Sequence, residues 1–197
     1  MRRGWLTRAR ADDLLQRLWR ELPFRRDQIT LFGRRVEQPR LTAWCSDPGV
    51  DYRYSGLWLR SRPWRAGLDM LRDELEEAAG ARFNSVLVNA YRDGRDSMGW
   101  HADNEPELGA NPTIASLSLG ESRRFRIRPS DALRRHGRSL GIDLGHGDLL
   151  LMSGSSQSRW QHCITRTRRE VGLRINLTFR NIRGGSISAA GQAGRRV

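Results

Sequence analysis

Residues 173–180, LRINLTFR, alternate strictly between apolar and polar side chains. Because successive side chains of a β-strand point to opposite faces, this alternation predicts a strand with two different surroundings. The apolar face, which we expect in the hydrophobic core, carries Leu173, Ile175, Leu177 and Phe179. The polar face carries Arg174, Asn176, Thr178 and Arg180. Arginine is common on exposed antiparallel strands, so the pattern alone favours a solvent-facing surface over a binding site.

The second half of the chain is a series of short strand-like segments separated by Gly, Asp and Pro turns. We predict two amphipathic helices in the first half, one beginning at Asp12 or Asp13 and ending at Pro23, the other at residues 66–79. Strands are predicted at residues 83–91, 113–119, 123–128, 147–152 and 171–181, with further short strands between residues 28 and 54. The pattern predicts a mainly β fold with flanking helices (α+β), built as a β-sandwich or jelly roll.

The length of 197 residues suits one compact domain, and the chain has no internal repeat. We expect residues 1–10 to form a loose basic arm and residues 11–182 to form the domain. Residues 183–197 are small, polar and basic, so we expect a disordered tail. We expect the protein to be a monomer.

The chain is strongly basic, with 35 Lys and Arg against 22 Asp and Glu and a net charge of +13. A field of this sign favours a polyanionic partner, and nucleic acid is the first candidate. The alternative is an arginine-rich soluble protein without such a partner, and charge alone does not separate the two. No apolar run is long enough for a membrane span or a signal peptide, so no membrane partner is expected.

The cysteine content predicts a reducing compartment. Cys45 and Cys163 are the two cysteines, and they lack CxxC spacing. This argues against a disulfide scaffold and a thiolate zinc site, and we expect a cytoplasmic location.

The tripeptide His-Ala-Asp at residues 101–103 could grip a metal ion, because residues two apart in an extended segment project to the same side. A lone HxD is a weak signal that a third ligand would strengthen. His136 and His146 lie in charged or turn-forming segments, whereas His162 has aromatic and apolar neighbours and is the best candidate. Two histidines and one carboxylate suit a non-haem iron(II) oxygenase, and zinc hydrolases use the same ligand types.

Arg174 and Arg180 could bind an anion, since arginine recognises carboxylates with planar two-point geometry. Their Cα atoms should lie about 20 Å apart along a strand, too far for both to grip one end of a small molecule. Each could bind one end of a dicarboxylate if the side chains reach inward or a twist shortens the gap. Asn89 and Tyr91, which share a face of their own predicted strand, would add neutral donors.

Several motifs in unbroken order over residues 10–182 together resemble the AlkB family of Fe(II)- and 2-oxoglutarate-dependent dioxygenases. They are HxD, a downstream His, RxNxTxR, NAYRDG, IASLSLG, FRIRP and HGDLLLM. Upstream, LFGRRVEQPRLTAW and YRYSG resemble the members that act on duplex DNA. The resemblance implies a double-stranded β-helix (jelly-roll) core and an N-terminal nucleotide-recognition region at about residues 25–60.

The resemblance also implies the cofactors and their ligands. It assigns Fe(II) to His101, Asp103 and His162, which are then the catalytic centre. It assigns the two carboxylates of 2-oxoglutarate to Arg174 and Arg180, with the pocket completed by Asn89, Tyr91 and Asn176. The implied reaction uses O2 and couples decarboxylation of 2-oxoglutarate to hydroxylation of an N-alkyl carbon on a base. Succinate, CO2 and an aldehyde are released, and the base is repaired.

On the substrate side, a base must leave the duplex stack to reach the iron. By resemblance, Tyr54 stacks on the flipped base with His101 on its opposite face, and Tyr52 and Ser55 border the pocket. Glu105 matches an acidic position that accepts from an exocyclic amine, which favours adenine- or cytosine-type lesions. An exposed turn glutamate is the alternative for Glu105.

Further substrate contacts are expected from Phe32 and from basic residues. Phe32 resembles a finger residue that fills the gap left by the flipped base, and an ordinary core residue is the alternative. Arg40 and residues 134–138 are expected to contact phosphates. Trp100 departs from the smaller or polar residue that the family usually places before the iron-binding histidine.

The sequence therefore predicts a DNA dealkylation-repair dioxygenase. One alternative is an RNA demethylase with the same chemistry. Another is a non-catalytic, basic nucleic-acid-binding module. The complete ligand set and both arginines argue against the non-catalytic module.

Overall fold

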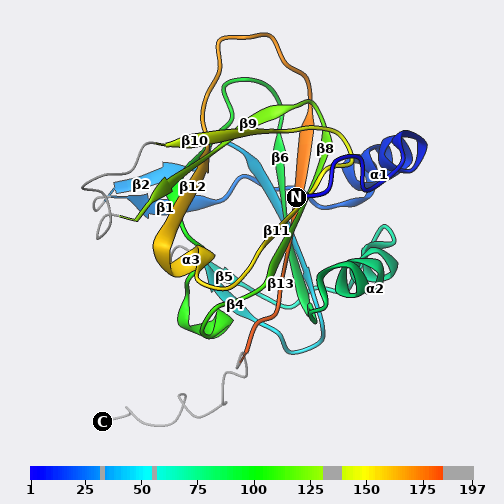
Figure 1. Ribbon diagram of the computed structural model, residues 1–197, viewed down its shortest axis with the longest axis vertical. Coiled ribbons are helices and arrows are strands. Elements are labelled where there is room, and N and C mark those ends of the chain that lie inside the picture. The colour runs from blue at the N-terminus through cyan, green and yellow to red at the C-terminus, as the bar shows by residue number, and fades with distance from the viewer. Residues whose placement is uncertain (32–33, 55–56, 131–138, 184–197) are drawn as a thin grey trace, which may run out of the picture.

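The computed structural model describes residues 1–31, 34–54, 57–130 and 139–183, and it contains two facing β-sheets (Figure 1). The five-stranded sheet has the order β11-β8-β13-β6-β3. Its strands are β3 (Leu41–Ser46), β6 (Ser85–Tyr91), β8 (Ile114–Gly120), β11 (Leu149–Met152) and β13 (Arg174–Arg180). The four-stranded sheet has the order β10-β9-β12-β7. Its strands are β7 (Met98–His101), β9 (Arg123–Pro129), β10 (Leu140–Leu144) and β12 (Trp160–Ile164).

The chain crosses repeatedly between the two sheets from β6 to β13. It passes from β6 in the large sheet to β7 in the small one, back to β8, across to β9 and β10, and then through β11, β12 and β13 in alternating sheets. All of the strand pairs are antiparallel. This winding is that of a double-stranded β-helix, so the predicted jelly-roll core is confirmed.

Two helices cover the outer face of the large sheet, on the side away from the small sheet (Figure 1). They are α1 (Arg8–Glu21) and α2 (Leu68–Ala79), and their buried leucines pack against the apolar side of β6, β8 and β13 in one continuous core. Ile175, Leu177 and Phe179 of β13 lie fully buried in this core. The apolar half of the LRINLTFR pattern is therefore packed as predicted.

The polar half of that pattern faces the space between the two sheets. Arg174 is 1% exposed and Arg180 is 2% exposed. The expectation from the pattern alone, a solvent-facing surface, is therefore wrong. Burying two guanidinium groups costs free energy unless partners or a ligand compensate for it, so their placement indicates a binding site.

Two small hairpins lie outside the jelly roll. The first pairs β1 (Gln28–Leu31) with β2 (Arg34–Glu37), and the second pairs β4 (Tyr52–Tyr54) with β5 (Leu57–Leu59). The expected short strands between residues 28 and 54 are thus present. The strands β5, β7, β10 and β12 were not predicted. In β7, the sequence MGWH has no apolar alternation because a glycine and a candidate metal ligand occupy it.

The N-terminal residues are bound to the domain and do not form the loose arm that we expected. Arg2 and Leu149 exchange two backbone hydrogen bonds, and the Gly4 N–H donates to Asp148. Leu6 is buried in the core. Helix α1 consequently starts at Arg8, capped by Thr7 rather than by an aspartate. Among the described residues, no helix is long and apolar enough to span a membrane.

Gly120 ends β8 in a conformation that only glycine adopts without strain, with φ +80°. A Cβ atom there would lie 2.2 Å from the Leu173 carbonyl oxygen, next to the start of β13. We expect Gly120→Ala to lower the free energy of unfolding by about 3 kcal/mol, or the melting temperature by about 6–12 °C.

Gly49→Ala is the matched control for this effect. Gly49 has a similar φ of +78°, but a Cβ there would meet nothing within 4 Å. The expected cost is about 1 kcal/mol, from backbone strain alone. Equal melting temperatures for the two variants would show that the contact with Leu173 does not constrain this turn.

Candidate active site

The candidate metal ligands come from two paired strands. His101 ends β7 and lies directly opposite His162 of β12 in the antiparallel register. Asp103 follows His101 by two residues, and the potential ligand atoms of the three side chains lie within 4.8 Å of one another. The sheet therefore brings together the HxD motif and the downstream histidine, as the sequence predicts.

All three side chains are in the protonation state that metal binding needs. Burial lowers the pKa of His101, and the Gly99 carbonyl lies 2.9 Å from its Nδ1, which leaves Nε2 free to coordinate. Burial and the neighbouring His101 lower the pKa of His162 to about 3. Burial raises the pKa of Asp103, but Arg180 and the two histidines outweigh it and hold that pKa at about 2. Two neutral imidazoles and a carboxylate therefore converge.

The two oxygens of the Asp103 carboxylate differ in their hydrogen bonding. Its Oδ1 accepts a 2.8 Å hydrogen bond from Arg180 Nη2, and both side chains are almost fully buried. Its Oδ2 is buried and has no hydrogen-bond partner among the described residues. A buried carboxylate oxygen without a partner is costly. A divalent cation between Oδ2 and the two imidazoles would satisfy it, so the site fits iron(II).

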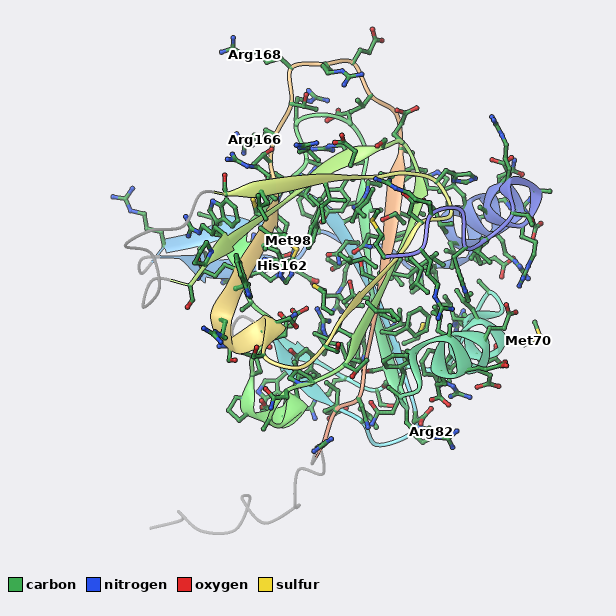
Figure 2. All side chains as sticks on the ribbon, in the orientation of Figure 1. Met70, Arg82, Met98, His162, Arg166 and Arg168 are labelled. Atoms are coloured by element: carbon green, nitrogen blue, oxygen red, sulfur yellow. The ribbon has the colours of Figure 1, made fainter. Side chains whose placement is uncertain are left out.

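The pocket beside these ligands lies between the two sheets. Figure 2 shows Met98 of β7 next to His162 there, and both side chains line the pocket. The polar face of β13 forms the opposite wall through Arg174, Asn176, Thr178 and Arg180. Asn89 and Tyr91 of β6 also line it. Every residue that the resemblance assigns to 2-oxoglutarate therefore borders one pocket.

Arg174 is a buried cation in this pocket wall. Its Nη2 donates to Ser118 Oγ over 3.0 Å, and its guanidinium lies 5.1 Å from the centroid of the Tyr91 ring. Burial lowers the pKa of Arg174 to about 10, so it remains charged at neutral pH. No carboxylate pairs with Arg174 in the part of the chain that the structure describes. The buried guanidinium of Arg174 could therefore bind an anionic group of a ligand in this pocket.

The remaining polar wall is held by its own hydrogen bonds. Asn176 Nδ2 donates to Ser116 Oγ, and Thr178 Oγ1 lies 3.1 Å from Asn176 Oδ1. Thr178, which had no expected role, therefore orients the Asn176 amide. Arg40 Nε donates to Asn89 Oδ1 over 2.7 Å, and Arg40 is only 5% exposed. The predicted phosphate contact of Arg40 is therefore wrong, because the side chain points inward to the pocket wall.

Comparison with known proteins agrees with this geometry. Residues 1–180 match the model of the 2OG-Fe(II) oxygenase superfamily. DNA oxidative demethylase ALKBH2 of Mus musculus is 37% identical over 182 residues, which cover 89% of this chain and 76% of that protein. The chain belongs to the AlkB family. The cofactors of its superfamily are iron(II), 2-oxoglutarate and O2, as the sequence predicts.

Two further relatives extend this assignment. Alpha-ketoglutarate-dependent dioxygenase alkB homolog 3 of Bos taurus is 38% identical over 190 residues, which cover 91% of this chain. This chain spans 64% of the length of that bovine protein, less than two thirds of it. The solved structure of OsALKBH1 is 15% identical, covers 91% of this chain and 94% of its own, and aligns with a TM-score of 0.62, which supports the AlkB fold.

Two residues expected on the substrate side of this AlkB family member, Tyr52 and Glu105, lie near the metal ligands. Tyr52 is fully buried, and burial raises the pKa of its hydroxyl. Burial raises the pKa of Glu105, and its Oε2 has no hydrogen-bond partner among the described residues. Glu105 is thus not an exposed turn residue. Phe32, Ser55, the Tyr54 side chain and residues 134–138 lie outside the described residues, so their predicted contacts remain predictions.

Sequence reasoning missed several residues of this AlkB site. Ser116 and Ser118 alternate with apolar residues in β8, and this period could have placed them on the pocket side. Gln157 accepts a hydrogen bond from the Asp103 backbone N–H, and no sequence signal indicated it. The Trp100 ring packs against two arginines of β9, with guanidinium-to-ring distances of 5.8 Å for Arg126 and 4.2 Å for Arg128. Trp100 therefore packs outward across the small sheet.

Proposed function

We propose that this AlkB family member is an Fe(II)/2-oxoglutarate-dependent dioxygenase that removes N-alkyl lesions, methyl or etheno, from DNA bases. The observation that carries the proposal lies in the pocket that buries Arg174: two neutral histidines converge there on an Asp103 oxygen that has no hydrogen-bond partner among the described residues. Bound iron(II) would supply the oxidation that couples 2-oxoglutarate breakdown to hydroxylation of the alkyl carbon. Succinate, CO2 and an aldehyde are the expected products.

The residues of the chain bind and orient the reactants. His101, Asp103 and His162 would hold the metal, and Arg174 would bind one carboxylate of 2-oxoglutarate. Arg180 contacts the second carboxylate in our proposal and also fixes Asp103 through their 2.8 Å ion pair. The two sheets enclose these groups and keep water from the reacting atoms. Electrostatic contacts in such a site are stronger than in water.

The proposed substrate is a base on nucleic acid. The net charge of +13 suits a phosphate backbone. Glu105 Oε2 is buried and has no hydrogen-bond partner among the described residues, so it suits an exocyclic amine of adenine or cytosine. DNA is favoured over RNA because a relative at 37% identity is named a DNA oxidative demethylase. An RNA demethylase of the same chemistry is the second candidate.

The decisive assay combines the protein with iron(II), 2-oxoglutarate and methylated or etheno-modified oligonucleotides, single- and double-stranded, DNA and RNA. We expect succinate formation that matches the loss of the alkyl mass from DNA. Faster turnover of methylated RNA than of any DNA would favour the RNA demethylase. Binding of oligonucleotides without succinate formation would favour the non-catalytic module.

Glu105→Gln tests the lesion preference. The substitution keeps the shape of the side chain but turns one acceptor oxygen into a donor, which would face the amine of the base. We expect turnover of 1-methyladenine and 3-methylcytosine to fall about tenfold, the effect of one lost hydrogen bond to a charged acceptor. Uncoupled succinate formation without DNA is the control and should stay unchanged. Unaltered repair would remove Glu105 from the substrate site.

We further propose that the protein acts as a monomer in a reducing cytoplasm without a membrane partner. Both cysteines are free and buried, which suits a compartment where disulfides do not form. Light scattering after gel filtration tests the oligomeric state, and a mass of two chains would contradict the proposal. Imaging of the tagged protein in its native cell tests the location.

A further inference from the structure

The segment that carries Asp103 has no regular structure to hold it. Strand β7 ends at His101, and the 3-10 helix η1 (Pro106–Leu108) begins three residues after Asp103. Residues 102–105 belong to neither a strand nor a helix. A metal ligand in such a segment needs another constraint, because ligand placement within about 0.5 Å matters for a metal site.

One buried side chain contacts the backbone of this segment. Gln157 is 3% exposed, and its Oε1 accepts a 2.9 Å hydrogen bond from the Asp103 N–H. The amide is fixed from the other side, because its Nε2 lies 3.2 Å from Ser156 Oγ and 3.5 Å from Met152 Sδ. Because Nε2 donates to these two acceptors, the carbonyl oxygen of the same amide is directed at Asp103.

Gln157 also belongs to the segment that leads to the third ligand. It lies in the short helix α3 (Ser156–Arg159), which runs directly into β12 and its His162. One amide therefore joins the irregular segment of Asp103 to the element that positions His162. The Arg180 contact fixes the carboxylate of Asp103, and the Gln157 contact fixes its main chain.

We propose that Gln157 is a positioning residue of the metal site, which holds the Asp103 backbone so that Oδ2 faces the two histidines. The inference rests on the metal site of the proposed function and assigns a new residue to it. Partners that orient metal ligands typically contribute about 10–100-fold to metal affinity. Without the acceptor, the buried Asp103 N–H loses its hydrogen bond and the segment is free to shift.

The test uses Gln157→Met and Gln157→Glu, with cobalt(II) as the metal. Met has the length and flexibility of Gln but cannot accept the N–H, whereas Glu keeps an acceptor oxygen. We expect Gln157→Met to weaken cobalt(II) binding about 10–100-fold, measured by calorimetry and by the visible spectrum of the bound ion. Gln157→Glu should retain wild-type affinity to within about threefold, since the acceptor is kept.

A packing role would produce the opposite order. Met would be tolerated in the buried site, and Glu would be the worse substitution because it buries a carboxylate. Melting of the metal-free proteins measures that effect separately. If Gln157→Met does not fold, Gln157→Asn, which withdraws the acceptor by one methylene, should show the same loss of affinity.

Gln161→Leu is the matched control. Gln161 lies on β12, four residues away, and its Oε1 accepts from Arg128 within the small sheet rather than from the metal segment. We expect wild-type cobalt(II) affinity for it. Wild-type affinity in Gln157→Met, or equal losses in Gln157→Met and Gln157→Glu, would overturn the positioning role alone. Absence of cobalt(II) binding by the wild-type protein would overturn the metal site itself.

Discussion

Replacing His101 by alanine is expected to reduce succinate formation at least about 1000-fold, since loss of one of three ligands removes several kcal/mol of metal binding and activation. His101 lies at the end of β7, and one of its ring nitrogens is already directed to the Gly99 carbonyl. Its other ring nitrogen, Nε2, is the atom that we expect to bind the metal. Succinate release and cobalt(II) affinity should fall together, while circular dichroism stays unchanged.

His146→Ala is the control for this result. His146 is a histidine outside the pocket, where it accepts a hydrogen bond from the Gly120 N–H. We expect it to keep wild-type turnover and metal affinity. If His101→Ala retained succinate formation, the assignment of the three ligands would be wrong.

Replacing Asp103 by alanine would change two properties of the protein at once. Asp103→Ala removes the carboxylate that pairs with the buried Arg180, and breaking a buried ion pair costs about 3–5 kcal/mol. Loss of activity in that variant would therefore combine a lost ligand with a destabilised domain. His101→Ala separates the two effects.

Replacing Arg174 by methionine is expected to raise the KM for 2-oxoglutarate about 100-fold. Loss of one partner from a buried, hydrogen-bonded charge pair costs about 2–5 kcal/mol, and Arg174 has no acidic partner in the described chain. The metal ligands are untouched, so cobalt(II) affinity should stay at the wild-type value. Rates of succinate formation over a range of 2-oxoglutarate concentrations measure this KM, and titration in the presence of manganese(II) measures the accompanying loss of affinity.

The melting temperature is a second measurement for Arg174→Met, and we do not expect it to show a loss. Burial lowers the pKa of Arg174, which means that folding disfavours its charged form. Replacing a buried charge by an apolar side chain is often neutral or stabilising. The melting temperature of the cosubstrate-free protein should therefore not fall.

Arg124→Met is the control for both measurements. Arg124 is an exposed arginine of β9 paired with Asp143, so its replacement should change neither the KM for 2-oxoglutarate nor the melting temperature. An unchanged KM in Arg174→Met would show that the guanidinium does not bind the cosubstrate.

Arg180 serves as a contrast to Arg174. It contacts Asp103 directly, so Arg180→Met should weaken both metal and 2-oxoglutarate binding. The sequence treats the two arginines of RxNxTxR as equivalent anchors. The structure separates them, since one is paired with a metal ligand and the other with neutral groups.

The parts of the fold with regular periodicity could be predicted from the sequence. The alternation in residues 173–180 placed Ile175 and Phe179 in the core, and the helical leucines marked both helices that cover the large sheet. The alternation did not reveal that its polar face is buried. Solvent and a polar pocket select the same residue types, and only the second sheet distinguishes them.

The residues that the sequence could not place depend on contacts between distant segments. Gln157 and Asp103 are 54 positions apart, and Arg40 and Asn89 are 49 apart. Neither pair leaves a spacing or a period in the chain. The strands β7 and β12 were missed because metal ligands and their neighbours interrupt the apolar pattern, which is common at functional sites. The motif resemblance supplied the ligands where periodicity failed.

A crystal structure with manganese(II) and 2-oxoglutarate tests the central claim most directly. We expect one metal ion bound by His101 Nε2, Asp103 Oδ2 and a ring nitrogen of His162. The cosubstrate should chelate this ion and place one carboxylate on Arg174. A metal ion bound elsewhere, or a cosubstrate that does not touch Arg174, would contradict it.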